Sequence, residues 1–142
     1  MAYLSHFSER SGIIACVTDW GCWWQTVDEI HIEVKFPPDQ PKKSKDITLK
    51  ITPSTIECIV SSNLIFKGKL FSIVHGDEVI WTIEDKGCLL NIVLPKADYA
   101  AKDIIWSSLM ADGTLSAQVR GTLLIGDYKN FIFNSLDFYC GR

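Results

Sequence analysis

The feature that most constrains the fold is an alternation of apolar and polar side chains that begins at Glu29. Ile30, Ile32 and Val34 take every second position, and polar residues such as His31 stand between them. A period of two predicts a β-strand with one buried face. The prolines of FPPDQP then end the strand, because proline cannot donate to a sheet. We therefore place the three aliphatic residues in the core and expect His31 to face outward as an ordinary, exposed histidine.

Similar apolar runs return at short intervals along the chain. They are ITLKI (47–51), TIECIV (55–60), NLIFKG (63–68), KLFSIV (69–74), VIWTI (79–83) and CLLNIVL (88–94). Turn residues separate the runs, and the SSN between the second and third predicts a hairpin. We interpret KGK (67–69), which spans the junction of the third and fourth runs, as another hairpin turn. Short strands at this spacing predict an all-β fold, an antiparallel β-sandwich of about seven strands.

The chain divides into three parts by pattern. Residues 1–19 form an irregular lead-in, residues 20–112 the folded domain, and residues 113–142 a short C-terminal extension that is helical or irregular. The segment ADYAAKDIIWSSLMADG at the end of the domain fits either one helix or a loop followed by a last strand, IIWSSLM. Its periodicity does not decide between them.

Composition excludes several classes of function. The 142 residues carry a net charge of −3 and a pI near 5.5, whereas nucleic-acid-binding domains are usually basic. We find no signal peptide and no apolar run long enough to span a membrane. The five cysteines form no C-x-x-C pair, so we expect reduced thiols and a cytoplasmic protein.

The stretch DEVIWTIED sets four carboxylates, Asp77, Glu78, Glu84 and Asp85, around one tryptophan. In a strand over VIWTI, Trp81 and Ile83 face the core, and the two acidic pairs lie some 20 Å apart. A glycosidase pair needs carboxyl groups about 5–10 Å apart that face one substrate. We therefore favour a structural or partner-facing role over catalysis.

Other chemistry is equally sparse. The chain contains no G-x-S-x-G, H-E-x-x-H, Walker or Rossmann pattern, so we expect no catalytic residue, metal, cofactor or small-molecule substrate. The aromatic run WGCWW fits either a plug in the core or a platform for a sugar or peptide. A carbohydrate-binding or hydrolytic sandwich that uses this run with Glu84 is a remote alternative.

Four blocks in order resemble the CS domain of the NudC (nuclear movement) family. They lie in WWQTVDEIHIEVKFPP, LIFKGKLFSIV, DEVIWTIED and LLNIVLPKADYAAKDIIW. The residues that carry the resemblance are Trp24, Gln25, Thr26 and Glu29; Lys67, Gly68, Lys69 and Leu70; Trp81 to Asp85; and Lys96, Trp106 and Leu109. The match covers about residues 20–110.

The resemblance implies an antiparallel β-sandwich without catalytic activity. It also implies a chaperone or co-chaperone that works with heat-shock protein 90 and supports clients of the dynein/LIS (lissencephaly-protein) pathway. By analogy, we expect partner contacts at Trp24, at Lys67, Gly68 and Lys69, and at Glu84 and Asp85. The opposite charges of the last two groups could pair with each other or steer a partner. A holdase that binds unfolded proteins without heat-shock protein 90 or ATP is the alternative.

Overall fold

The computed structural model of the protein describes residues 13–97 and 105–119. These residues form antiparallel strands with short 3₁₀ turns and no α-helix, which confirms the predicted all-β sandwich. The strands are β1 (Ile13–Ile14), β2 (Cys16–Val17), β3 (Gly21–Gln25), β4 (Glu29–Lys35), β5 (Ile47–Ile51), β6 (Thr55–Val60), β7 (Asn63–Lys69), β8 (Ile80–Glu84), β9 (Leu89–Pro95) and β10 (Gln118–Val119). The 3₁₀ turns are η1 (Ser44–Asp46), η2 (Gly76–Glu78) and η3 (Asp85–Gly87).

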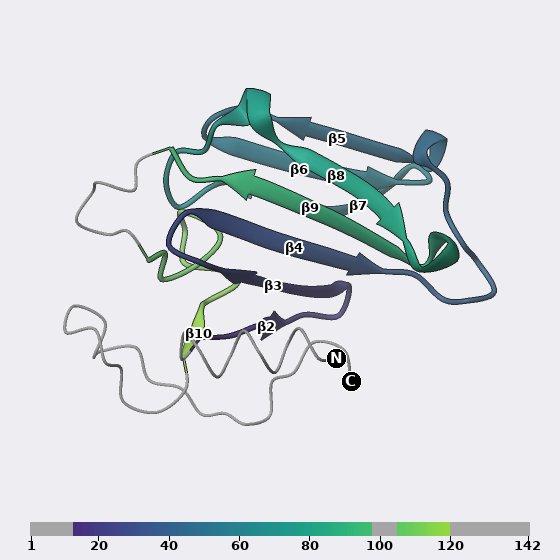
Figure 1. The fold of residues 1–142 in the computed structure, drawn as a ribbon, viewed down its shortest axis with the longest axis horizontal. Helices are drawn as coiled ribbons and strands as arrows, with labels where there is room; N and C mark the ends of the chain where they lie inside the picture. The colour runs from purple at the N-terminus through teal and green to yellow at the C-terminus, as the bar shows by residue number, and fades with distance from the viewer. Residues whose placement is uncertain (1–12, 98–104, 120–142) are drawn as a thin grey trace.

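Two sheets make up the sandwich. The large sheet has five strands in the order β2-β3-β4-β9-β8, and the small sheet has three in the order β5-β6-β7. Figure 1 shows the small sheet layered against the β9–β8 side of the large sheet, while β3 and β2 extend beyond it. A third pairing, β1 with β10, joins the start of the described chain to its end.

The core lies between the two sheets. On β4 the alternation places Ile30, Ile32 and Val34 on the inner face, and all three are buried. They stand in register with Leu94, Ile92 and Leu90 of β9. Trp81 and Ile83 lie on the same face of the edge strand β8, where they are half-buried and pack against this core. The buried residues facing them from the small sheet include Ile56, Cys58, Val60 and Phe66.

The hairpin predicted at SSN is confirmed, because β6 and β7 pair across it. Ser61 and Ser62 both have positive φ, 50° and 69°. Two such residues give a two-residue turn whose twist matches that of the flanking strands. The left-handed conformation is therefore carried here by two serines, a residue pair that seldom signals this turn.

The prediction that KGK forms a hairpin turn is wrong, because Lys67, Gly68 and Lys69 are the last residues of β7. A Cβ on Gly68 would lie 2.9 Å from Met110 Sδ, so this glycine permits a close approach rather than a turn. The strand expected over KLFSIV is also absent from the described structure. Its buried residues Leu70 and Val74 form single bridges to Met110 and Lys96, two different partners, so the segment crosses between elements instead of joining one sheet.

The segment 105–117 is neither a helix nor a continuous strand. It contacts both sheets: Phe71 N donates to Leu109 O at 2.9 Å on the small-sheet side, and Trp23 Nε1 donates to Leu115 O at 3.0 Å on the large-sheet side. Its backbone groups are thus satisfied by separate partners rather than by one ladder. The part of the C-terminal extension described here ends in β10, and the helical interpretation of the rest lies outside the described residues.

The strand of the acidic segment is shifted by one residue from the predicted bounds, 79–83. Asp77 and Glu78 belong to η2, and β8 begins only at Ile80. Glu84 is the last residue of β8, and Asp85 opens η3 with φ 56°. The two carboxylate pairs therefore occupy opposite ends of an edge strand, as predicted.

The cysteines differ in state. Cys16, Cys58 and Cys88 are free, and burial raises the pKa of the Cys58 thiol to about 12, as expected of a small buried apolar residue. Cys22 is disulfide-bonded. The expectation of reduced thiols is therefore wrong for Cys22. Among the described residues, no helix has the length and apolarity needed to cross a membrane.

A prediction concerns the turn between β8 and β9. Gly87 and Gly113 both have φ 91°, but a Cβ on Gly87 would lie 2.8 Å from Pro41 Cβ and 2.9 Å from Lys42 O, whereas one on Gly113 meets nothing within 4 Å. In urea denaturation, we expect Gly113→Ala to lower the free energy of unfolding by about 1–2 kcal/mol through backbone strain alone. Gly87→Ala should cost at least about 1 kcal/mol more, because it also clashes. Equal losses would contradict the packing of this turn on the 41–42 loop.

Candidate partner-binding surfaces

A buried polar cluster fixes the frame on which the surfaces lie. The Gln25 side chain, fully buried at the end of β3, donates through Nε2 to Trp106 O at 2.9 Å and accepts from Trp106 N at 2.8 Å. The same Oε1 accepts from Lys96 Nζ at 3.0 Å, and Lys96 also donates to Thr26 O at 2.8 Å. We call Gln25, Lys96 and Trp106 the hub. It joins the end of β3, the residue after β9 and the 105–117 segment.

The hub carries a buried positive charge. Lys96 is only 2% exposed, and its Nζ lies 5.9 Å from the centroid of the Trp106 ring. Burial lowers the pKa of Lys96 to about 8, although the charge of Asp28 acts in the opposite direction. Because removing one partner leaves the others buried and unsatisfied, such a network is costly to break.

The outer face of the large sheet contains a hollow of about 250 Å³. Its lining combines two aromatic rings, two carboxylates, an amide and one aliphatic side chain: Trp24, His31, Glu33, Glu84, Leu89 and Asn91. Strand register explains this gathering, because Trp24 pairs with His31, and Glu33 pairs with Asn91. We call it the large-sheet hollow.

His31 is more enclosed than a free surface histidine. Its ring stacks on Trp24 with centroids 5.2 Å apart and planes 2° apart, and its Nε2 lies 3.0 Å from Glu29 Oε1. Burial lowers the pKa of His31, and the nearby Glu29 opposes that effect. His31 thus faces outward, as predicted, but the prediction that it is an ordinary exposed residue is wrong.

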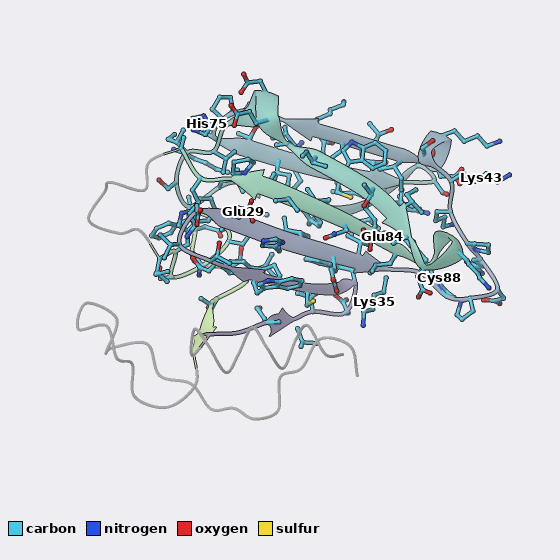
Figure 2. All side chains as sticks on the ribbon, in the orientation of Figure 1. Glu29, Lys35, Lys43, His75, Glu84 and Cys88 are labelled. Atoms are coloured by element: carbon cyan, nitrogen blue, oxygen red, sulfur yellow. The ribbon has the colours of Figure 1, made fainter. Side chains whose placement is uncertain are left out.

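Two polar groups shape the other side of the hollow. Glu84 Oε2 accepts from Thr82 Oγ1 at 2.8 Å and from Asn91 Nδ2 at 3.4 Å, which orients the carboxylate over the sheet. Asn91 Oδ1 is buried and has no hydrogen-bond partner. Figure 2 shows Glu84 at the same end of the large sheet as Lys35 and Cys88, with Glu29 at the opposite end.

The three tryptophans of WGCWW do not form one cluster. Trp23 is buried on the inner face. Trp24 is also buried, with 8% of its surface exposed, but lies on the outer face. Trp20 is half-buried with its ring centroid 4.8 Å from that of Phe66. Alternation along β3 separates Trp23 from Trp24. The structure therefore joins Trp24 with Glu84 in one hollow, but it gives no platform of stacked tryptophans.

The outer face of the small sheet contains a second recess, of about 370 Å³. Lysines and threonines dominate its lining, which includes Lys50, Thr52, Thr55, Glu57, Lys67 and Lys69. Lys50, Glu57 and Lys67 stand in one cross-strand row, and Thr55 stands opposite Lys69. We call this recess the small-sheet groove.

The two proposed charge groups do not pair. Lys67 and Lys69 line the small-sheet groove, whereas Glu84 lines the large-sheet hollow on the other sheet. In the described part of the chain, the one ion pair joins His31 and Glu29. The alternative in which the lysines neutralise Glu84 and Asp85 is therefore wrong, and both groups remain candidates for contact with a partner.

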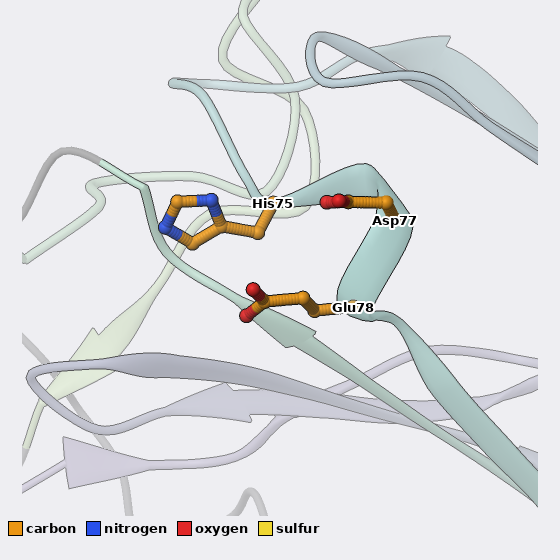
Figure 3. Close-up of side chains that lie close together, drawn as sticks. All are labelled: His75, Asp77 and Glu78. Carbon is orange, nitrogen blue, oxygen red and sulfur yellow. The ribbon is translucent and has the colours of Figure 1, made fainter.

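His75, Asp77 and Glu78 form a small cluster in and beside η2. Their potential ligand atoms lie within 4.8 Å of one another, and Figure 3 shows both carboxylates and the imidazole on the same side of the turn. His75 is half-buried and the two carboxylates are exposed. Such groups are common without an ion, and no other described feature points to one, so we assign no metal site here.

Four residues line these recesses although none was predicted as a binding residue: Lys50, Glu57, His31 and Asn91. Each lies on a different strand from the predicted site residues, and only cross-strand register brings it to them. The outward positions of β5 and β6 were readable from their alternation. The pairing of Lys50 with Glu57 additionally requires the length of the β5–β6 turn.

Residues 19–96 match the CS domain family, so the chain belongs to that family. Among known proteins it is 39% identical over 104 residues to NudC domain-containing protein 2 of rat, covering 73% of this chain and 64% of that protein. It is 30% identical to nuclear movement protein nudC of Dictyostelium discoideum, covering 54% of this chain and 44% of that one. This chain thus spans less than two thirds of each relative's length.

A solved structure agrees with the fold. The CS domain of human KIAA1068 protein superposes with a TM-score of 0.55 at 19% identity, covering 68% of this chain and 77% of that domain. The CS-domain fold and the NudC-type sequence resemblance are therefore both confirmed. The hub explains part of the sequence pattern, because Gln25, Lys96 and Trp106 belong to two separate blocks of the motif and meet in space.

The buried charge of the hub predicts a pH dependence of stability. Between the pKa of about 8 in the folded protein and the ordinary value of 10.5, the unfolded chain binds a proton that the folded protein does not. Stability must therefore rise with pH across this window, by on the order of 2–3 kcal/mol. Below pH 8, Lys96 is protonated in both the folded and the unfolded protein, so it adds no pH dependence to the free energy of unfolding.

Urea denaturation at pH 7 to 10.5 would measure the contribution of Lys96 as the difference in free energy of unfolding between the wild type and Lys96→Gln. Subtraction cancels the titration of the groups that the two proteins share. The difference should grow in favour of the wild type as the pH rises. A difference that stays flat, or that falls, would show that Lys96 is not held in a desolvating site.

Proposed function

We propose that this chain is a non-enzymatic co-chaperone of the NudC type. In this role it assists heat-shock protein 90 in the cytoplasm and stabilises dynein-pathway clients of the LIS type, with a part in nuclear movement. The CS-domain match over residues 19–96 carries the proposal, because CS domains are typically co-chaperone modules of heat-shock protein 90. The similarity to nuclear movement protein nudC of Dictyostelium discoideum supports the link to nuclear movement.

The large-sheet hollow supports a protein contact. It offers a stacked aromatic pair, the oriented carboxylate of Glu84 and the unpaired Oδ1 of Asn91 within one recess of a rigid sheet. Aromatic anchors beside polar groups are typical of the centres of protein interfaces. Glu84 and Trp24 are thus our candidates on this face, with Asp85 at its edge.

We expect a titration of isotope-labelled protein with heat-shock protein 90, with and without an ATP analogue, to shift backbone amides around Glu84. Glu84→Lys should weaken the complex about tenfold, because it reverses a charge at the contact. The melting temperature should change little, since Glu84 is exposed. Asp39→Lys makes the same charge change at an exposed position in the loop after β4 and should bind like the wild type.

A silent titration of well-folded protein would contradict the heat-shock protein 90 part of this proposal. Equal weakening by both variants would show a general charge effect and remove the large-sheet hollow from the interface. Amide shifts that cluster elsewhere would support the co-chaperone function but place its contact with heat-shock protein 90 on another surface.

One observation favours the alternative, an ATP-free holdase. Ile80 on the outer side of edge strand β8 is 64% exposed, and Leu64 on β7 is 57% exposed. Exposed aliphatic side chains on edge strands can bind unfolded chains, although isolated ones are common on any surface.

Light scattering of a heat-unfolded enzyme separates the two functions. We expect no suppression of aggregation by this protein alone, because the co-chaperone acts through its partner. Suppression without heat-shock protein 90 or ATP that Ile80→Ser reduces would favour the holdase. Leu64→Ser tests the second of the two exposed aliphatic side chains in the same way.

A further inference from the structure

The small-sheet groove gathers positive charge on a protein that is acidic overall. Lys50, Lys67 and Lys69 are exposed around the groove, while the chain as a whole carries a net charge of −3. No carboxylate among the described residues lies within ion-pair distance of any of these lysines. Their charges are therefore available to an anionic group from outside.

Strand geometry sets the spacing of the charges. Lys67 and Lys69 are two residues apart on β7, so their side chains leave the same face about 7 Å apart. Lys50 lies beyond β6, in the same row as Lys67, about 10 Å away across two strand spacings. An extended chain with acidic residues at alternate positions has the same two-residue repeat as Lys67 and Lys69.

Glu57 makes the groove selective. It stands between Lys50 and Lys67 and is half-buried, so a uniformly anionic surface laid over the sheet would meet its carboxylate. This disfavours a nucleic-acid backbone or an anionic membrane, which cannot omit charge at one point. A peptide can place carboxylates over β7 and a neutral side chain over β6.

The apolar neighbours point to a protein as the occupant. Ile59 is half-buried, and it pairs with the exposed Leu64 on the adjoining stretch of β6 and β7. A polypeptide can cover such side chains while its carboxylates meet the lysines.

We propose that the small-sheet groove binds an acidic, extended segment of a partner protein, with carboxylates at alternate residues facing Lys67 and Lys69. This inference rests on the proposed function only in that the occupant is a protein partner. It assigns the groove a partner separate from the surface that meets heat-shock protein 90.

The probe is a capped peptide with the repeat Glu-Thr-Glu-Thr-Glu, titrated into the full isotope-labelled chain at low salt. We expect amide shifts at residues 50, 55–57 and 67–69, and binding that weakens as salt rises. The corresponding Gln-Thr and Lys-Thr peptides should not bind. Absence of shifts in the groove would overturn the inference. The lysines would then serve only to keep the edge strand from pairing with another chain.

Charge variants test the assignment. Lys67→Glu with Lys69→Glu should weaken the acidic peptide at least tenfold, whereas Lys35→Glu with Lys45→Glu, which makes the same change in net charge at exposed sites elsewhere, should leave it within about threefold. Both variants keep charged residues, so protection of the β7 edge is preserved. Equal weakening would reduce the effect to net charge and overturn the inference.

A gain of affinity provides a result that misfolding cannot imitate. Glu57→Gln removes the opposing carboxylate and should tighten the acidic peptide about threefold or more. Unchanged or weaker binding would contradict the arrangement of the groove.

The two titrations, with heat-shock protein 90 and with the acidic peptide, separate this inference from the proposed function. If heat-shock protein 90 shifts amides near Glu84 while the acidic peptide is silent, the groove proposal fails and the co-chaperone stands. If the peptide binds and heat-shock protein 90 does not, the groove stands without that partner.

Discussion

The structure depends on one buried side chain, Gln25, whose amide makes three hydrogen bonds to partners far along the chain. It holds the backbone of Trp106 on both sides and accepts from Lys96. An apolar residue here would remove the side-chain partners of the Trp106 backbone N–H and C=O and one acceptor of the buried Lys96 ammonium, and this sets the cost of losing Gln25. The hub thereby ties the 105–117 segment to the end of the large sheet, and that segment also bonds to Lys69 and Phe71 at the end of β7.

Because the hub and the core fix both sheets, the outer faces are free to differ. The large-sheet hollow combines stacked rings with carboxylates, while the small-sheet groove carries lysines around a single glutamate. A rigid sandwich with two chemically distinct faces suits a protein that contacts more than one partner. The outward residues can differ between the two sheets without any change in the core residues, because the two kinds alternate along each strand.

The strands and most of the core were predictable from the sequence. Alternation identified β4, the β6–β7 hairpin and the inner positions Ile30, Ile32 and Val34, because a sheet with one buried face repeats every two residues. The strand predicted over 69–74 is absent because Leu70 and Val74 bridge to two different partners, and the KGK turn was wrong because of a contact distant in sequence. Gly68 looks like a turn residue, but it serves the close approach of Met110, a contact made across 42 positions of sequence.

What the sequence determined by itself is therefore the fold class, the core faces and the residues that resemble the NudC motif. Tertiary structure decided which of those residues meet. It placed Gln25, Lys96 and Trp106 in one hub and Trp24 beside Glu84, and it set Lys50 in line with Lys67. The physical reason is that local alternation tells a side chain which face to take, whereas strand register and sheet order, set by turns and long-range packing, choose its neighbours.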